Sequence, residues 1–478
     1  MREFGLTIRG VRRRVVTSLL LLAVASLAPL ANATTNFVGG VISANTWWSN
    51  TVVVVSSVSV PNGVTLTVLP GTQVRVSNNL SISAQSGAAI DVQGVATNTV
   101  VFSPFNGATT WGSLTASGAG SSVTLRHAEV SRGGINLSSG ATALMEDCYL
   151  HDVPSAIVGT FAASVTLRRV HLNNYTETIY NSTLVLMEDC LFENLTAIGS
   201  DGIELGDAPS GCVIRRCTLR NGTGSNTDAL DCNGAREVLI HDCLIYNFSD
   251  KGLSFGAASL GGAVSAGMIV SNCLIYGVNI GIALKDGATA SFYNNTIADS
   301  VYGVSFYEKL IGMGAGRCTN GWNNILFNNF TNVNLLNGAT LTNFYSDIQG
   351  TNWPGSGNIS ADPLFLNAPA RDYRLAANSP AISTGRNGSN MGAQFPVGSW
   401  MALSQPKFSS AVKSAGAFEM SFWADGMRSY TVQAANSLGQ PSWEKVMDVA
   451  TNVLPRLITV TNSVTSNRFF RIATPLQP

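Results

Sequence analysis

The sequence predicts an all-β chain, made of a long solenoid of stacked coils and a small β-sandwich. A short motif recurs eight times between residues 128 and 324, which gives a mean period of 24.5 residues. Periods of this size are typical of stacked-repeat architectures. Only 12% of the residues are charged and 47 are glycine, a composition that suits many short strands joined by turns.

The repeated motif places a cysteine at the same step of successive coils. It is clearest in Leu-Met-Glu-Asp-Cys-Tyr-Leu at 144–150 and in Leu-Met-Glu-Asp-Cys-Leu-Phe at 186–192. The residues at this step are Ala128, Cys148, Val170, Cys190, Cys217, Cys243, Cys273, Asn295 and Asn324. We expect the cysteines to stack as small buried groups, and we expect Asn295 and Asn324 to form a side-chain amide ladder.

Disulfides between coils are not expected within this stack, because parallel side-chain directions suit a bridge poorly. The pairs Cys212–Cys217 and Cys232–Cys243 stay open as alternatives. The spacing of cysteine and histidine does not resemble a zinc site.

The first 33 residues have the pattern of a signal peptide. Five arginines precede an apolar stretch at 15–30, and Ala31-Asn32-Ala33 fits a cleavage site. An uncleaved membrane anchor is the alternative, but the apolar stretch is short for a span. Removal of residues 1–33 changes the net charge from 0 to −4, which argues against a nucleic-acid partner. We therefore expect an exported monomer, secreted or in the cell envelope, without a membrane span.

The mature N-terminal part alternates with a period of two residues, which predicts strands. The segment Val-Pro-Asn-Gly-Val-Thr-Leu-Thr-Val-Leu-Pro-Gly-Thr-Gln-Val at 60–74, followed by Trp111-Gly112, resembles the opening coils of secreted proteins of the pectate-lyase-like superfamily. Short motifs that begin at Asp362, Asp372, Ser379 and Met391 resemble the end of such domains. The resemblance implies a right-handed parallel β-helix over 36–395, with a cap from about 362.

The pattern of the sequence changes after the cap, where the solenoid repeat ends. We expect a linker at 396–408 and a small β-sandwich at 409–478, because short apolar strands separated by turns fill this stretch. It resembles the small C-terminal β domains of exported bacterial proteins. Attachment, sorting and sugar binding all stay open as its role.

A second strand in each coil aligns polar residues into columns. One column holds Asp201, Asp228, Lys251, Ile280 and Tyr302; an outward column holds Glu204, Asp231, Ser254, Ala283 and Ser305; a third holds Gly206, Asn233, Gly256, Lys285 and Tyr307. Adjacent coils lie about 4.8 Å apart, so four carboxylates should cluster on one face. These are Asp201, Glu204, Asp228 and Asp231.

Four carboxylates that lie so close must share protons or be compensated by a cation. Ca²⁺ prefers such oxygen ligands, so we expect these residues to be able to hold Ca²⁺. In one hypothesis the ion binds a uronic-acid sugar while Lys251 abstracts a proton and starts β-elimination. A lysine acts as a base only when its pKa is lowered, and the nearby carboxylates oppose this.

A second enzymatic hypothesis is hydrolysis. Across the two hypotheses, the candidate catalytic residues are Asp228, Asp250, Lys251 and Lys285. Asn226-Thr227-Asp228 followed by Asp250 resembles part of the polygalacturonase pattern. In this chain Lys251 replaces the second aspartate of that pattern, Gly-His-Gly is absent from the sequence, and only Lys285 remains of Arg-Ile-Lys. These differences remove most of the groups that would act as general acid and general base in hydrolysis.

The function that we expect from the sequence is the binding of a polysaccharide or cell-surface glycan along the acidic face. Glu204, Asp231, Tyr302 and Tyr307 are the candidate substrate-binding residues, whereas Phe306 is equally explained by the core. A polysaccharide lyase, a polygalacturonase-like hydrolase and a non-catalytic structural or adhesive envelope protein are the alternatives. Purely structural roles are also open for the acidic residues, since aspartate and glycine form turns in any solenoid.

Overall fold

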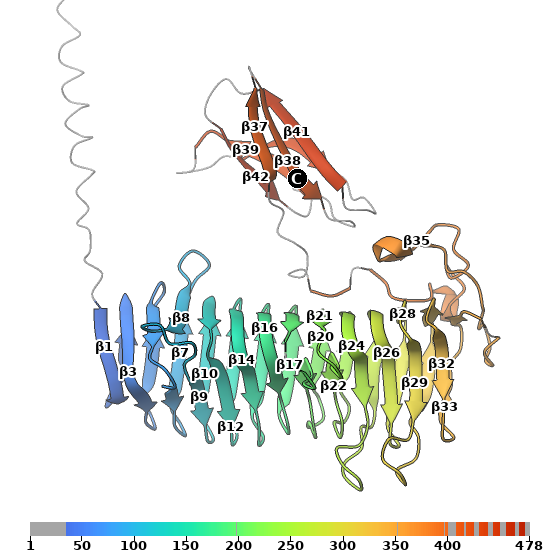
Figure 1. Ribbon diagram of the computed structural model, residues 1–478, viewed down its shortest axis with the longest axis horizontal. Helices are drawn as coiled ribbons and strands as arrows, with labels where there is room; N and C mark the ends of the chain where they lie inside the picture. Colours follow the sequence, from blue (N-terminus) through green and yellow to red (C-terminus); the bar gives the residue numbers. More distant parts are fainter. Residues whose placement is uncertain are drawn as a thin grey trace, which may run out of the picture.

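The computed structural model describes residues 35–196, 198–350, 352–395, 397–399, 408–414, 417–424, 430–437, 443–449, 456–463 and 468–473. The expected signal peptide at 1–33 and most of the expected linker at 396–408 lie outside these residues. Within them the expected fold class is confirmed: strands stack into a parallel β-helix, and small antiparallel sheets follow toward the C-terminus (Figure 1). None of the helices in the described part of the chain has the length and hydropathy that a membrane span needs.

Two long parallel sheets form the walls of the solenoid. The first sheet contains, in order, β2 (Thr46–Trp48), β4 (Thr65–Val68), β7 (Ala89–Gln93), β10 (Ser122–Arg126), β13 (Thr142–Glu146), β15 (Ser164–Arg168), β17 (Leu184–Glu188), β20 (Val213–Arg215), β23 (Leu239–His241), β25 (Met268–Ser271), β27 (Thr289–Tyr293), β30 (Arg317–Trp322) and β33 (Thr340–Leu341).

The second sheet contains β1 (Thr35–Val41), β3 (Thr51–Val60), β5 (Gln73–Val76), β6 (Ile82–Ala84), β8 (Val100–Pro104), β9 (Ser113–Ser117), β11 (Ala128–Ser131), β12 (Gly134–Ser138), β14 (Tyr149–Gly159), β16 (His171–Ile179), β18 (Leu191–Leu195), β19 (Ile203–Glu204), β21 (Thr218–Gly222), β22 (Leu230–Asp231), β24 (Leu244–Phe255), β26 (Leu274–Lys285), β28 (Thr296–Ala298), β29 (Tyr302–Tyr307), β31 (Ile325–Phe327), β32 (Thr331–Leu335) and β34 (Asp347–Ile348). This sheet bends within each coil, so that each coil contributes two strand segments to it.

A single coil shows how the sequence makes these turns. After β17 the chain turns at Asp189, whose φ is 55°, and Cys190 then points into the core. Asn194, with φ 60°, makes the next bend four residues later. Asparagine and aspartate tolerate this left-handed conformation better than other residues with a side chain. The short polar residues of the repeat therefore fix the corners of the coil.

The cysteine stack is confirmed by the strand register. The residues that follow successive cysteines pair directly, as Leu191 with Thr218 and Thr218 with Leu244. Each of the five stacked thiols donates to the carbonyl two residues earlier, at 3.2–3.3 Å. Each cysteine side chain thus fills space in the core and also donates a hydrogen bond to a carbonyl at the turn.

The asparagine ladder is confirmed as well. Asn295 Nδ2 donates to Asn324 Oδ1 at 3.1 Å, and the backbone N–H of Asn295 donates to the same oxygen at 3.0 Å. Both residues are buried. The amides continue the cysteine stack with stronger hydrogen bonds and belong to the turn.

All eight cysteines lie in the described residues and all are free thiols. The open pairs Cys212–Cys217 and Cys232–Cys243 are therefore not formed. Cys212 lies just before β20, where its thiol approaches the carbonyl oxygens of Pro209 at 3.4 Å and Thr183 at 3.6 Å. Cys217 belongs to the turn at the other end of that strand.

The free thiols lead to a direct prediction about reactivity. Burial raises the pKa of Cys148 and Cys318 to about 12, and it raises the pKa of Cys243 well above the usual range. Because the thiolate is the reactive form, a thiol reagent such as Ellman's reagent should label almost none of the native protein within an hour and about eight thiols after unfolding in urea. Fast labelling of two or more thiols in the native protein would contradict the buried stack.

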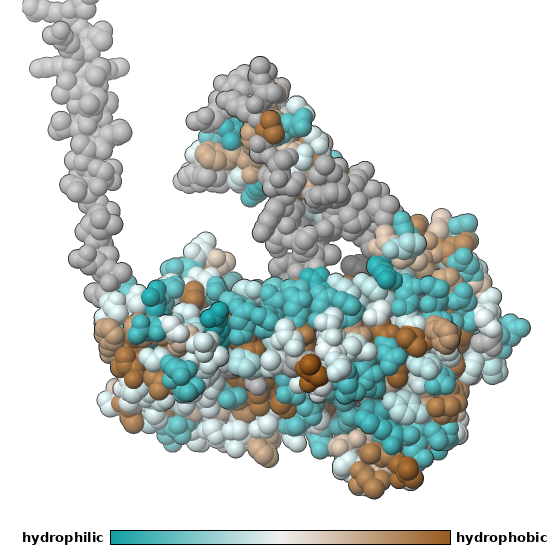
Figure 2. Space-filling view, viewed as in Figure 1, coloured by the Kyte–Doolittle hydropathy of each residue, from teal (hydrophilic) through white to brown (hydrophobic). Residues whose placement is uncertain are grey.

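Hydrophilic residues predominate on much of the visible outer surface of the solenoid, with smaller apolar patches between them (Figure 2). Part of the polar surface is a ladder in which acids and bases alternate. Arg169 pairs with Asp147 at 2.7 Å, and Arg216 pairs with Asp189 at 2.9 Å. All four histidines join such pairs, for example His171 with Glu193 at 2.8 Å, so they act as polar residues of the coil surface.

The cap folds back along the solenoid. It contains β35 (Phe365–Asn367), the 3-10 turn η1 (Ala368–Ala370), β36 (Asp372–Leu375) and the 3-10 turn η2 (Arg386–Gly388). The segment after η2 then follows the corner of the coils toward the N-terminus: Gly392 N donates to Asn323 O at 2.6 Å, and Gly398 N donates to Asp242 O at 2.7 Å. This strap covers the corner of several coils (Figure 1).

The last described strands form two antiparallel sheets of three strands each. They are β37 (Phe408–Ser414), β38 (Ala417–Ala424) and β41 (Arg456–Ser463), and β39 (Tyr430–Ala435), β40 (Glu444–Val449) and β42 (Phe469–Ala473). Side chains from both sheets share one buried cluster, in which the rings of Phe422 and Tyr430 pack edge to face at 5.6 Å. This packing confirms a small β-sandwich.

Candidate functional site

The columns predicted from the sequence are present in the structure. Ile203 pairs with Leu230 and Glu204 with Asp231. One coil further, Asp231 pairs with Ser254, and this column continues through Ala283 and Ser305. The register is as predicted, but Ser254, Ala283 and Ser305 are buried, so the expected outward exposure of the column is wrong at these three positions. The polar residues that are distant in sequence therefore meet on one face.

Three carboxylates converge on this face. Asp201, Asp228 and Asp231 each place an oxygen within 4.8 Å of the other two. Glu204 is next to Asp231 in the register but is not part of this group. The expected quartet is thus a group of three, which we call the acidic cluster, with Glu204 beside it.

Backbone hydrogen bonds hold the acidic cluster in place. Asp201 Oδ1 accepts the N–H of Asp228 at 2.9 Å, and Asp228 Oδ1 accepts the N–H of Lys251 at 2.9 Å. Asp231 accepts from Asn233, through the backbone N–H at 3.0 Å and through Nδ2 at 2.8 Å. Asp201 and Asp228 therefore link consecutive coils, whereas Asp231 bonds within its own coil. These structural roles coexist with any binding role.

Proximity and burial change the acidity of these groups. Burial, and then the charge of Asp228, raise the pKa of Asp201 to about 8. Burial also raises the pKa of Glu204, with Glu177 and Asp231 adding to the effect. For Asp228, burial raises the pKa and the charge of Lys251 opposes it. These shifts favour a proton on Asp201 at neutral pH.

Lys251 is an ion-pair partner in this structure. Its ammonium group lies 3.1 Å from Asp228 Oδ1 and also contacts Asp250. Burial alone lowers the pKa of Lys251, but the two carboxylates outweigh burial and raise the pKa above its usual range. This arrangement does not supply the neutral amine that β-elimination by Lys251 requires.

Lys285 lies on the same face in a different environment. Its side chain is 1% exposed, and Nζ donates to Ser254 Oγ at 2.8 Å. Among the described residues no carboxylate forms an ion pair with it, and burial lowers its pKa. The lowered pKa favours the neutral amine, but burial keeps Lys285 away from a large substrate.

The expected aromatic residues divide between surface and core. Tyr302 and Tyr307 lie in β29 and are half-buried, so part of each ring faces outward. Phe306 is fully buried and packs against Phe292, with 6.1 Å between the ring centres. Of these three residues, Tyr302 and Tyr307 remain available for contact with a sugar.

Comparisons with known proteins address the fold. The family described as "Right handed beta helix region" matches residues 155–347, about two fifths of the chain. Together with the parallel coils, this match confirms the expected right-handed parallel β-helix. No curated protein matches the sequence.

Solved structures with a similar arrangement include three that cover most of this chain. Pectate lyase Pel9A is 15% identical, with a TM-score of 0.40 over 71% of this chain and 88% of its own. The A-module of mannuronan C-5 epimerase AlgE4 from Azotobacter vinelandii is 14% identical, with a TM-score of 0.33 over 69% of this chain and 92% of its own. A tailspike protein mutant of E. coli bacteriophage HK620 is 10% identical, with a TM-score of 0.31 over 92% of this chain and 87% of its own.

Proposed function

We propose that this chain is an exported protein that binds polysaccharide along the face that carries the acidic cluster. The observation that supports the proposal is the convergence of Asp201, Asp228 and Asp231 on the outside of the solenoid, with oxygens within 4.8 Å of one another. Carboxylates are planar acceptors that suit the hydroxyl groups of sugars. A regular face that repeats every ~4.8 Å also suits an extended polymer.

We propose further that a divalent cation, Ca²⁺ by its preference for oxygen ligands, compensates the acidic cluster. The donor set fits, because all three residues offer carboxylate oxygens and two of them are only half-buried. Asp201, Asp228 and Asp231 would hold the ion. Bound Ca²⁺ would supply a positive centre for a carboxylate or hydroxyl group of the glycan, and Lys251 already compensates part of the charge of Asp228.

The experiment combines metal and glycan binding. Calorimetry with Ca²⁺ should show one site in the wild type and at least a tenfold weaker site in Asp231→Asn, because one ligand loses its charge. Binding to polygalacturonate, alginate and an α-glucan should fall in parallel. Asp91→Asn is the matched control, since Asp91 is a partly exposed carboxylate on the first sheet and pairs with Arg126 at 3.6 Å. Equal Ca²⁺ affinity in both variants and the wild type would exclude the cation site.

A second candidate function is hydrolysis of the bound glycan. The raised pKa of Asp201, about 8, favours it, because a carboxyl group that is protonated at neutral pH can act as a general acid. The carboxylate oxygens lie within 4.8 Å of one another. Inverting enzymes need roughly 6.5–9.5 Å to leave room for a water, so this spacing argues against an inverting mechanism. New reducing ends in the glycan incubations would favour hydrolysis, and new unsaturated ends would favour β-elimination. The absence of both leaves binding alone.

A further inference from the structure

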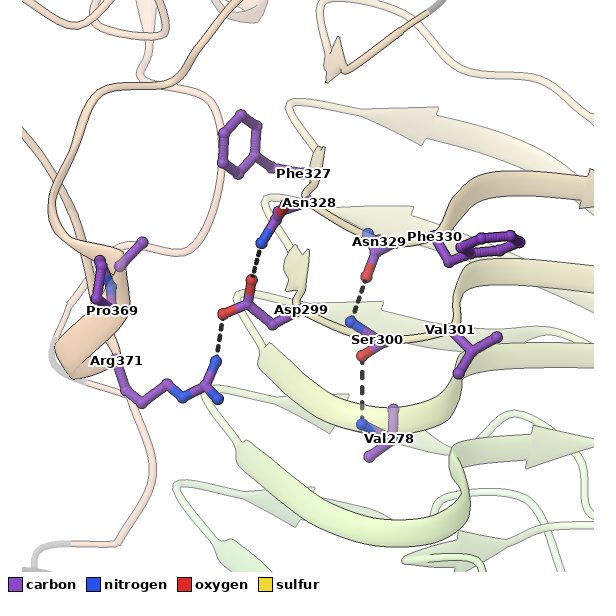
Figure 3. Close-up of a pocket in the computed structure, with 11 residues that line it drawn as sticks. Val278, Asp299, Ser300, Val301, Phe327, Asn328, Asn329, Phe330, Pro369 and Arg371 are labelled. Atoms are coloured by element: carbon purple, nitrogen blue, oxygen red, sulfur yellow. Dashed lines mark hydrogen bonds and ion pairs between the residues drawn. The ribbon is translucent and has the colours of Figure 1, made fainter.

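A groove with a volume of about 900 Å³ lies where the cap meets the coils of β28, β29, β31 and β32. One wall comes from the cap, with Ala368, Pro369 and Arg371, and the other comes from the corners of the coils (Figure 3). The groove is separate from the acidic cluster. The sequence does not predict it, because its walls come from two stretches of the chain, 278–330 and 368–371.

The polar residues of the groove are held in fixed positions. Asp299 accepts from Asn328 at 2.6 Å and pairs with Arg371 (Figure 3). It also accepts from the hydroxyl of Tyr373 at 2.6 Å. The guanidinium of Arg371 lies over the ring of Tyr276, 5.3 Å from its centre. A groove whose side chains are already ordered loses little entropy when a ligand enters.

Two apolar side chains stand open beside these polar residues. Phe330 is 88% exposed and Val301 is 44% exposed, and both line the groove. They occupy equivalent places in adjacent coils, because the residues that follow them, Tyr302 and Thr331, pair in the register. An aromatic and an aliphatic side chain thus form a small apolar strip within a polar groove.

The apolar strip continues a line that starts at the acidic cluster. Lys251, Ile280, Tyr302 and Thr331 are in register, so the residues before them fall in four successive coils. These are Asp250, Asn279, Val301 and Phe330. Asn279 Nδ2 donates to Asp250 Oδ1 at 3.2 Å, which joins the first two, and Asp250 contacts Lys251 of the acidic face. Three coil steps place Phe330 about 14 Å from Asp250.

We propose that this groove is a distal subsite for the same polysaccharide, in which the apolar face of a pyranose ring stacks on Phe330 while polar groups of the sugar meet Arg371 and Asn328. The inference rests on the proposed function and adds a direction to it: the polymer runs along the solenoid axis from the acidic cluster toward the cap. Sugars present C–H groups on one face and hydroxyls at the edge, and the groove offers the matching pair of an open ring and fixed polar groups.

The length of the ligand provides the test. A disaccharide is too short to reach both the acidic cluster and Phe330, whereas an octasaccharide reaches both. With oligogalacturonates, oligoalginates and malto-oligosaccharides as probes, Phe330→Ala should weaken binding of the octasaccharide about tenfold and leave binding of the disaccharide at the acidic cluster unchanged. Phe161→Ala is the matched control, since Phe161 is another exposed phenylalanine, 73% exposed, in an earlier coil.

Hydrogen exchange gives a readout that is independent of affinity. The octasaccharide should protect backbone amides at 327–331 and 368–371 in the wild type, and the disaccharide should not. Equal octasaccharide affinity in Phe330→Ala and Phe161→Ala would overturn the distal subsite while the effect of Asp231→Asn upholds the acidic face. If the wild type binds none of the three sugar series, both the subsite and the proposed function fall.

Discussion

Lys251→Met is expected to lower the free energy of unfolding by about 3–5 kcal/mol, whereas Lys285→Met should change it by less than about 1 kcal/mol or raise it. The two lysines lie on the same face, both are buried, and methionine has a similar length. They differ in their partners. Lys251 pairs with Asp228 and Asp250, so its removal leaves two carboxylates without compensation in a poorly solvated place.

Lys285 has no such pair among the described residues and donates only to the hydroxyl of Ser254. Its charged form is disfavoured by burial, as the lowered pKa indicates. Methionine removes the buried ammonium and leaves one hydroxyl without its partner, and these two effects nearly cancel.

Urea unfolding at pH 7 of the wild type and both variants measures this contrast. The double variant Lys251→Met with Asp250→Asn should recover part of the lost stability, because one uncompensated charge is then removed. Equal losses in Lys251→Met and Lys285→Met would contradict the assignment of Lys251 as the ion-pair partner. A severe loss in Lys285→Met alone would mean that its amine, and not that of Lys251, holds this face together.

The sequence was sufficient to predict the register of the solenoid. The cysteine step and the second-strand columns are properties of the repeat. The position of each residue depends only on its own coil and on the next coil. The meeting of Asp201 with Asp228 follows from this periodicity. The pairing of Lys251 with both Asp228 and Asp250 did not follow, since it depends on the direction of a long side chain.

The sequence carries a signal for the second corner of the coil. The residue four positions after the cysteine step is asparagine or aspartate in most coils, as in Asn194, Asn221 and Asn247. All three have positive φ, and their amides form a ladder with distances of 2.8 and 3.1 Å. Regular spacing of residues that tolerate the left-handed conformation was therefore enough to locate this corner.

The cap groove and the strap were beyond prediction from the sequence. The motifs at 362–393 indicated a cap, but a short motif does not say on which face of the solenoid it packs. Arg371 meets Asp299 across 72 residues, and Gly398 meets Asp242 across a longer separation. These contacts depend on how an irregular segment folds back, and no periodicity records that path.

Asp201→Asn is expected to make the protein more stable than the wild type at pH 9, by about 2–3 kcal/mol, and to match it near pH 4. The pKa of Asp201 is raised from 3.8 to about 8 in the folded state. Between about pH 4 and pH 8, the folded state therefore keeps a proton on Asp201 that the unfolded state has released. Stability of the wild type therefore falls as pH rises through this window. The shift sets an upper limit of about 6 kcal/mol, which relaxation around a half-buried side chain reduces.

Asparagine is neutral at every pH and keeps the oxygen that accepts the N–H of Asp228, so the variant should lose this part of the pH dependence without losing the link between coils. Urea unfolding at pH 4, 6, 8 and 9 measures the slopes, with Asp91→Asn as the control that keeps the slope of the wild type. Added Ca²⁺ should flatten the wild-type profile at high pH and leave that of Asp201→Asn nearly unchanged, because the ion takes over the compensation that the proton provides. Parallel profiles for the wild type and Asp201→Asn would show that Asp201 ionises as an ordinary surface carboxylate, and the electrostatic argument for a cation at the acidic cluster would then fail.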